Sequence, residues 1–261
     1  MAKQRRWVVK AGSKMVCDGG PLLMRTWMQQ VSQLRKKHGI EVIWVTSGAI
    51  AWASLRTGHK KSKNHLPQKQ ALSAIGQPLV MDQYNLALQA ASLLGAQVLL
   101  TADDIRNPTR KKNLQNTLHE LLRWKVIPIL NENDAVATEE IRFGDNDSLA
   151  SKVAVMMKAE RLILMTDVDG LYDADPNKNP QAQLISYCAK VGKAEYSLAD
   201  RKAVSKMGTG GMYSKLLAGE LALRQGIVTH LVRGDLPNNL LQIAEGRNPG
   251  TQIGGPYGRK K

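Results

Sequence analysis

The sequence predicts an α/β fold in which a parallel or mostly parallel sheet is covered by helices on both faces. Short, nearly continuous apolar runs alternate with longer amphipathic segments along the 261 residues, and such runs are typical of strands buried on both faces. Polar and glycine residues directly follow four of these runs. Open α/β sheets bind their ligands beyond the carboxyl ends of the strands, so the same residues indicate where a site lies.

The predicted elements follow one another in a regular order. The run RRWVVKAG at 5–12 reads as a strand that ends in a glycine turn, and the next segment as an amphipathic helix at 22–39, closed by Gly39. Apolar, β-branched runs predict further strands at 41–48, 97–104, 126–134, 160–170 and 227–234. Helical periodicity predicts helices at 68–95, 113–125, 148–159, 213–226 and 236–246, with a polar loop at 58–67.

Composition is that of an ordinary globular protein, with 43% apolar and 23% charged residues. No run approaches the length of a membrane span, and the N-terminus lacks the apolar region of a signal peptide. Two distant cysteines, Cys17 and Cys188, favour a reducing cytoplasm over a disulfide framework. The formal charge is +15, but the basic residues are spread along the chain without interleaved aromatics. We therefore expect solvated surface lysines rather than a specific nucleic-acid site.

Two polar loops are the most informative part of the chain. Seven acidic or amide residues occupy 131–134 and 145–147, each group beside an apolar run. Neither a core strand nor a core helix needs such a cluster at its end. The residues therefore indicate a ligand, such as an amino group, a metal–phosphate complex or an active-site lysine.

Three lysine–glycine or glycine junctions point to phosphate. Lys10 is followed by Gly12 and Ser13, and glycine lets a phosphate approach the backbone closely. The segment TSGAI at 46–50 is a strand–glycine–helix junction, and GTGGM at 208–212 precedes a helix with Ser214 and Lys215 in its first turn. Free N–H groups at such junctions attract anions. Each signal is weak alone, because a solvent-exposed lysine at a strand end or a flexible surface loop would have a similar sequence.

In combination, these segments resemble the amino acid kinase family and, within it, the glutamate 5-kinases. The resemblance runs from Val8 to about Gly250. The segments that carry it are VVKAGS (8–13), VTSGAIA (45–51), KQALSAIGQ (69–77), NENDAVAT (131–138), GDND (144–147), LMTDVDGLYDADP (164–176), NPQA (179–182) and GTGGMYSK (208–215). Acetylglutamate, uridylate and aspartate kinases share the fold but not the set of NENDAVA, GDND and GTGGM.

The resemblance implies one three-layer αβα domain over 1–253, followed by a short basic tail at 254–261. Many family members carry a C-terminal PUA module, but this chain stops shortly after the kinase domain, so we expect none. It implies ATP-dependent phosphorylation of the γ-carboxylate of L-glutamate, the first step towards proline. Mg²⁺ would be held mainly by the ATP phosphates, with no residue predicted to bind the metal directly. A homo-oligomer (dimer or tetramer) and feedback inhibition by proline are also implied, with no membrane partner.

The resemblance assigns the site residues as well. Ser47, Asp134 and Asn146 would bind glutamate, with Asp134 on its ammonium and Asn146 on a carboxylate. Lys10 and Lys215 would flank the transferred phosphoryl group, and Asp147 would orient both ammonium groups. The residues expected to bind ATP are Lys10, Thr166, Asp167, Thr209, Gly210, Gly211, Met212, Tyr213, Ser214 and Lys215.

The chain departs from the family pattern at several positions near these motifs. Lys14 stands where a small hydroxyl residue is usual, and the other departures are Trp52, Ala53, Ala102 and Lys152. Three other functions remain open at this point: a regulatory protein that binds the ligands without turnover, a family kinase with another acceptor, and a basic RNA-binding protein. The retained Lys10, Asp147 and Lys215 speak against the first.

Overall fold

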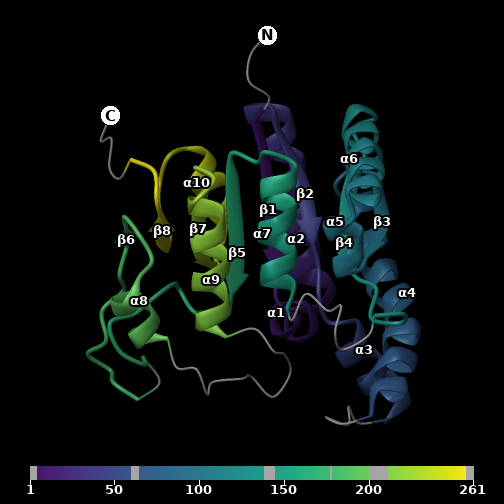
Figure 1. The fold of residues 1–261 in the computed structure, drawn as a ribbon, viewed down its shortest axis with the longest axis horizontal. Coiled ribbons are helices and arrows are strands. Elements are labelled where there is room, and N and C mark those ends of the chain that lie inside the picture. Colours follow the sequence, from purple (N-terminus) through teal and green to yellow (C-terminus); the bar gives the residue numbers. More distant parts are fainter. Residues whose placement is uncertain (1–4, 60–64, 138–144, 177, 200–210, 257–261) are drawn as a thin grey trace.

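The computed structural model describes residues 5–59, 65–137, 145–176, 178–199 and 211–256, and within them eight strands form one sheet (Figure 1). Their order is β3-β4-β2-β1-β5-β7-β8-β6. The neighbouring strands β3, β4, β2, β1, β5 and β7 all run parallel, and β8 is antiparallel to β7. The strands are β1 (Arg5–Ala11), β2 (Ile40–Val45), β3 (Gly95–Leu100), β4 (Ile127–Glu132), β5 (Arg161–Thr166), β6 (Tyr187–Cys188), β7 (Val228–Arg233) and β8 (Thr251–Ile253).

Helices cover both faces of this sheet. They are α1 (Ser13–Asp18), α2 (Gly20–His38), α3 (Ala49–Thr57), α4 (Leu66–Ala90), α5 (Ala102–Arg106), α6 (Pro108–Arg123), α7 (Asn146–Met156), α8 (Lys193–Leu198), α9 (Met212–Leu223) and α10 (Asn239–Ala244). Figure 1 shows α7 and α9 over the near face, and α2 lies behind the sheet. The predicted three-layer αβα fold with a mainly parallel sheet is confirmed.

Alternation along the central strand explains why its sequence is continuously apolar. Trp7 and Val9 of β1 join the core that includes residues of α2, α4 and α10. Val8, between them, joins the opposite core with residues of α6, α7 and α9. Successive side chains of a strand point to opposite faces, so a strand covered on both faces needs an apolar residue at every position.

The boundaries differ from the prediction where local capping or short length decides. The strand expected at 97–104 ends at Leu100, because Thr101 and Asp104 form a capping box that begins α5. The helix α4 continues through Pro78. The short helices α1, α5 and α8 and the strands β6 and β8 were not predicted, since so few residues carry no periodic signal.

The carboxyl ends of the parallel strands lie at one edge of the sheet, the lower edge in Figure 1, where α1 and α3 are found. The loop after β2 is fixed there by close packing of α3 on α4. A Cβ at Gly76 would lie 1.8 Å from the backbone oxygen of Ala49, so the two helix backbones touch. Gly48, with φ +97°, makes the turn into α3, a conformation that favours glycine.

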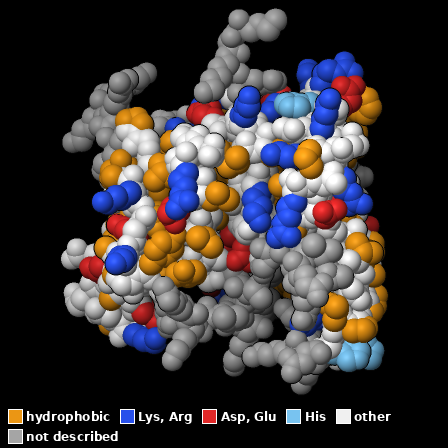
Figure 2. Space-filling view, in the orientation of Figure 1, with side chains coloured by type: hydrophobic (Ala, Val, Ile, Leu, Met, Phe, Trp, Pro, Cys, Tyr) orange, Lys and Arg blue, Asp and Glu red, His pale blue; other side chains and the backbone are white. Residues whose placement is uncertain are grey.

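The helical face shown in Figure 2 carries Lys and Arg side chains interspersed with apolar and acidic ones. They do not merge into one continuous basic field on that face. No helix within the described ranges is both long and apolar enough to cross a membrane.

Candidate active site

Two lysines and one aspartate meet at the carboxyl edge of the sheet. Nζ of Lys10, from β1, lies 2.6 Å from Oδ1 of Asp147, and Nζ of Lys215, from α9, lies 3.1 Å from Oδ2. Ser214 donates its hydroxyl to the same Oδ2 at 2.8 Å. The aspartate is fully buried and both lysines are 5% exposed. The structure thus brings together all three residues that the sequence predicts to act on the transferred group.

Burial and charge shape the titration of this cluster. Burial lowers the pKa of Lys10, and the neighbouring Lys215 adds to that effect while Asp147 opposes it. Burial alone would raise the pKa of Asp147, but its two ion pairs outweigh burial and hold the pKa of this carboxyl below its usual range. The cluster carries two positive charges and one negative charge, so its excess charge suits an anion.

Asn146, the first residue of α7, contacts the ends of two strands, β2 and β4. Its Nδ2 lies 2.7 Å from the backbone oxygen of Thr46, 2.8 Å from Oγ of Ser47 and 2.7 Å from Oδ1 of Asn131. One amide group has two protons for these three acceptors. A ligand carboxylate can therefore take one of these N–H groups only by replacing an acceptor from the protein.

Asn146 and its three acceptors form a hub that further buried polar contacts hold in place. Nδ2 of Asn131 donates to Oε1 of Gln77, which lies in α4, at 3.2 Å. The hydroxyl of Tyr84 accepts hydrogen bonds from Thr46 at 3.0 Å and from Nε1 of Trp44 at 2.9 Å, and burial raises the pKa of Tyr84 to about 12. These contacts tie the backbone that carries Ser47 to α4 and to β2.

A second carboxylate lies beside the lysine–aspartate cluster. Asp145 caps α7 by accepting from the backbone N–H of Ser148 at 2.8 Å. Burial raises its pKa, and the adjacent carboxylate of Asp147 adds to the rise. Two neighbouring carboxylates repel each other when both are ionised. A cation bound beside Asp145 would relieve this repulsion, so the pair favours a cation next to the ligand. Asp145, Asn131 and Gln77 were not among the predicted site residues, although the first two lie in the polar loops that the sequence marks.

Two of the residues expected to bind nucleotide, Thr166 and Asp167, lie at the end of β5, the strand next to the one that carries Lys10. Thr166 ends β5, and its hydroxyl donates to Oδ1 of Asp167 at 3.2 Å. Gly12 lies near enough to Lys10 that a Cβ there would be 3.7 Å from Nζ. A glycine at this position leaves that side of the ammonium uncovered.

The glycine loop before α9 is described from Gly211 onwards. Gly211 precedes the first turn of α9, which contains Met212, Tyr213, Ser214 and Lys215. The ring of Tyr213 lies 5.1 Å from that of Tyr196 in α8. The predicted residues Thr209 and Gly210 lie outside the described residues. Asp134 is half-buried in the turn after β4.

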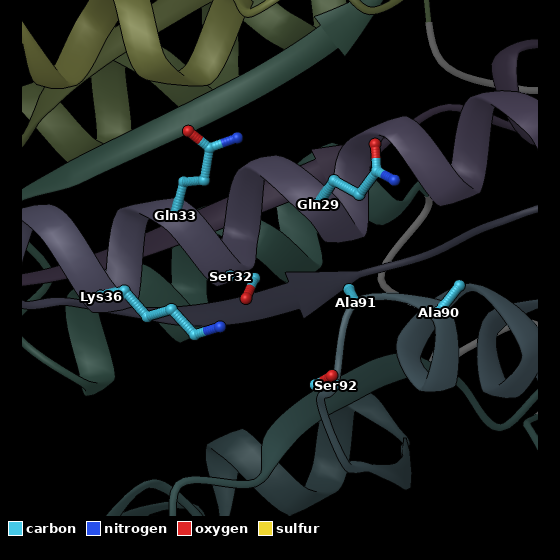
Figure 3. A pocket seen from close by; sticks show the side chains of 7 residues that line it. All are labelled: Gln29, Ser32, Gln33, Lys36, Ala90, Ala91 and Ser92. Atoms are coloured by element: carbon cyan, nitrogen blue, oxygen red, sulfur yellow. The ribbon is translucent and has the colours of Figure 1, made fainter.

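A groove on the other face of the sheet is unrelated to these residues. It lies between the second half of α2 and the end of α4, and Figure 3 shows it. Its lining consists of Gln29, Ser32, Gln33, Lys36, Ala90, Ala91 and Ser92. None of the predicted site residues faces it.

Proteins of known families are similar to nearly the whole chain. Residues 5–233 match the model of the amino acid kinase family. The chain is 45% identical to a glutamate 5-kinase of Thermus thermophilus over 95% of its length, and 40% identical to those of Alcanivorax borkumensis and Bacillus subtilis over 97%. It spans about two thirds of these relatives, namely 66%, 68% and 70% of their lengths.

Solved structures with the same fold are more distant in sequence. An isopentenyl phosphate kinase superposes with a TM-score of 0.65 at 17% identity, covering 95% of this chain and 100% of the other. The UMP kinase of Ureaplasma parvum gives a TM-score of 0.60 at 16% identity, with 97% and 100% covered. At such low identity the likeness concerns the fold alone.

Proposed function

The chain belongs to the amino acid kinase family, and we propose that it transfers the γ-phosphoryl group of ATP to the γ-carboxylate of L-glutamate. The observation that carries the proposal is the buried cluster of Lys10, Asp147 and Lys215. Relatives with glutamate 5-kinase activity in their names match 95–97% of the chain, which supports the choice of acceptor.

The reaction needs alignment and charge neutralisation rather than a base. The γ-carboxylate is already ionised at neutral pH, so its oxygen attacks the γ-phosphorus directly. The bond between that phosphorus and the β–γ bridging oxygen breaks, ADP leaves, and L-glutamyl 5-phosphate forms. Negative charge on the phosphoryl oxygens and the leaving oxygen is stabilised by positive groups that are already in place. In our proposal Lys10 and Lys215 are these groups. Their ion pairs with Asp147 hold both ammonium groups in fixed, buried positions.

The acceptor would lie beside the hub of Asn146. Ser47 accepts a hydrogen bond from Asn146 and keeps its own proton for a ligand oxygen. Asp134, in the turn after β4, would pair with the substrate ammonium, and Asn146 would contact a carboxylate. Together these groups would place the γ-carboxylate in line with the phosphoryl group, which accounts for much of the rate in such reactions.

Mg²⁺ would accompany ATP. No group of three His, Cys, Asp or Glu side chains suited to a metal occurs in the part of the chain that the structure describes. Mg²⁺ commonly binds through substrate phosphates with one or two carboxylates, and Asp145, whose pKa is raised by burial next to Asp147, has the chemistry for that role. When bound, the ion would neutralise charge on the phosphates.

The decisive experiment traps the product. The protein, ATP and Mg²⁺ are incubated with L-glutamate and hydroxylamine, which converts an acyl phosphate into a hydroxamate. We expect hydroxamate and ADP in equal amounts with L-glutamate, and none with aspartate, N-acetylglutamate or UMP. Hydroxamate from another acceptor would replace glutamate in the proposal, and ATP binding without any hydroxamate would favour a regulatory protein.

Two further properties follow from the family resemblance and are proposed with the activity. A homo-oligomer would be seen as a dimer or tetramer mass by light scattering. Inhibition by L-proline would be seen as a higher glutamate requirement at fixed ATP. A monomer that proline does not affect would contradict both while leaving the reaction intact.

A further inference from the structure

Lys14 forms an ion pair at the rim of the site that the reaction described above does not use. It lies in α1, two residues after Gly12, and its Nζ is 2.6 Å from Oδ2 of Asp167. Asp167 in turn follows Thr166 at the end of β5 and accepts its hydroxyl. The pair therefore joins the turn above Lys10 to the strand end where nucleotide is expected.

The ion pair is too exposed to be explained by stability. The Lys14 side chain is 53% exposed and that of Asp167 is 42% exposed. Pairs with such exposure contribute about 0–1 kcal/mol or less, because water screens them. The ammonium nevertheless stays charged, since the hydrogen bond and charge of Asp167 raise the pKa of Lys14. An ammonium has three N–H donors, and one carboxylate oxygen at 2.6 Å leaves donors for a further anion.

The charges that act most on Lys14 differ from those that act on Lys10. The charges that shift the pKa of Lys10 are those of Asp147, Lys215 and Asp145. Those that shift Lys14 are the charges of Asp167 and Asp18. The two lysines lie on either side of Gly12, so an extended polyphosphate that meets Lys10 at its transferred end can meet Lys14 further along.

We propose that Lys14 binds the phosphates of ATP that are not transferred, and that Asp167 positions its ammonium for that contact. This inference rests on the proposed phosphoryl transfer and adds a residue that determines nucleotide affinity. Because the contact is equal before and during transfer, it lowers the ATP requirement without raising turnover.

Direct binding of nucleotides, measured by calorimetry without glutamate, tests the inference independently of activity. The variants are Lys14→Met, which keeps length and removes charge, and Lys14→Arg, which keeps charge. Lys36→Met, an exposed lysine of α2, is the matched control. For Lys14→Met we expect Kd for ATP and ADP to rise about five- to tenfold, the loss of one charge-assisted hydrogen bond. Adenosine binding should be unchanged, and kcat should stay within about twofold.

Each outcome decides the matter. Rescue by Lys14→Arg together with an unaltered Lys36→Met supports the role of the charge. Equal ATP binding in Lys14→Met and wild type would reduce the pair to a surface contact and overturn the inference. An equal loss for ATP and adenosine, with a lower melting temperature, would also overturn it as a structural effect. If the wild type binds ATP but makes no hydroxamate, only the proposal of glutamate phosphorylation is refuted. The difference in ATP affinity between wild type and Lys14→Met would still test the role of Lys14. Wild type that binds neither ATP nor ADP would overturn both.

Discussion

Replacement of Asp147 by Asn tests the central cluster most directly. The substitution keeps the shape of the side chain and removes the one negative charge that both Lys10 and Lys215 contact, at 2.6 and 3.1 Å. The aspartate is fully buried, so water cannot take the place of the lost charge. Two ammonium groups would then face each other across a neutral amide.

The expected magnitudes follow from that burial. Removing one partner of a buried ion pair costs about 3–5 kcal/mol, because the other charge is left uncompensated. For a chain of this size each kcal/mol lowers the melting temperature by about 2–4 °C, so Tm should fall by about 6–20 °C. Turnover should fall about 10²- to 10³-fold, as expected when a positioned charge at such a site is misplaced.

The pH dependence gives the prediction a sign. The folded pKa of Lys10 already lies below its ordinary value of 10.5 because the side chain is buried, and the substitution removes a charge that raises it. Between the folded value and 10.5 the unfolded chain binds more protons, so stability rises with pH in that window. The variant has the lower folded pKa and the wider window. Its loss of stability relative to wild type should therefore shrink as pH rises through the interval between the two folded pKa values, which lies below 10.5.

The assays are chemical denaturation at several pH values and the hydroxamate reaction, with Asp82→Asn, an exposed aspartate of α4, as control. Asp82→Asn should resemble wild type throughout. A variant at Asp147 with wild-type Tm and turnover would refute the view that this carboxylate holds the two lysines. A large loss of stability with normal turnover of the folded fraction would limit its role to folding.

Three further predictions concern single positions. Lys215→Ala and Lys10→Ala should each lower turnover by about 10²-fold or more, the loss of one preorganised charge, and a rise in the ATP requirement alone would show that the lysine only anchors nucleotide. Asp134→Ala should raise the glutamate requirement by a factor equivalent to about 2–5 kcal/mol with little change for ATP, whereas equal loss for both substrates together with a lower Tm would make it a turn-capping residue. Gly76→Ala should destabilise the fold by about 1–3 kcal/mol, because its Cβ would lie 1.8 Å from the backbone oxygen of Ala49; an unchanged denaturation midpoint would show that α3 and α4 separate easily.

The sequence by itself determined the fold class and the edge of the sheet where the chemistry lies. Continuous apolar runs and helical periodicity are local signals, and the polar residues that follow the runs must gather at one edge once the strands are parallel. That is why Lys10, Thr166 and the loops at 131–134 and 145–147 could be assigned to one site before any contact was known. Boundaries set by caps, such as that at Thr101, and the short elements α1, α5, α8, β6 and β8 were beyond these signals.

Only the tertiary structure brings these polar groups into contact, including the pairing of Asp147 with Lys10 and Lys215 that the family resemblance implied. Lys215 is 68 positions from Asp147, and Lys14 is 153 positions from Asp167. Nothing in the neighbourhood of either residue along the chain encodes such a pairing. It arises because β1 and β5 are adjacent in the sheet and α7 lies beside α9, and the same packing buries the aspartate enough for its charge to hold two lysines. The hub of Asn146, with acceptors from the ends of β2 and β4, likewise exists only when strands distant in sequence lie side by side.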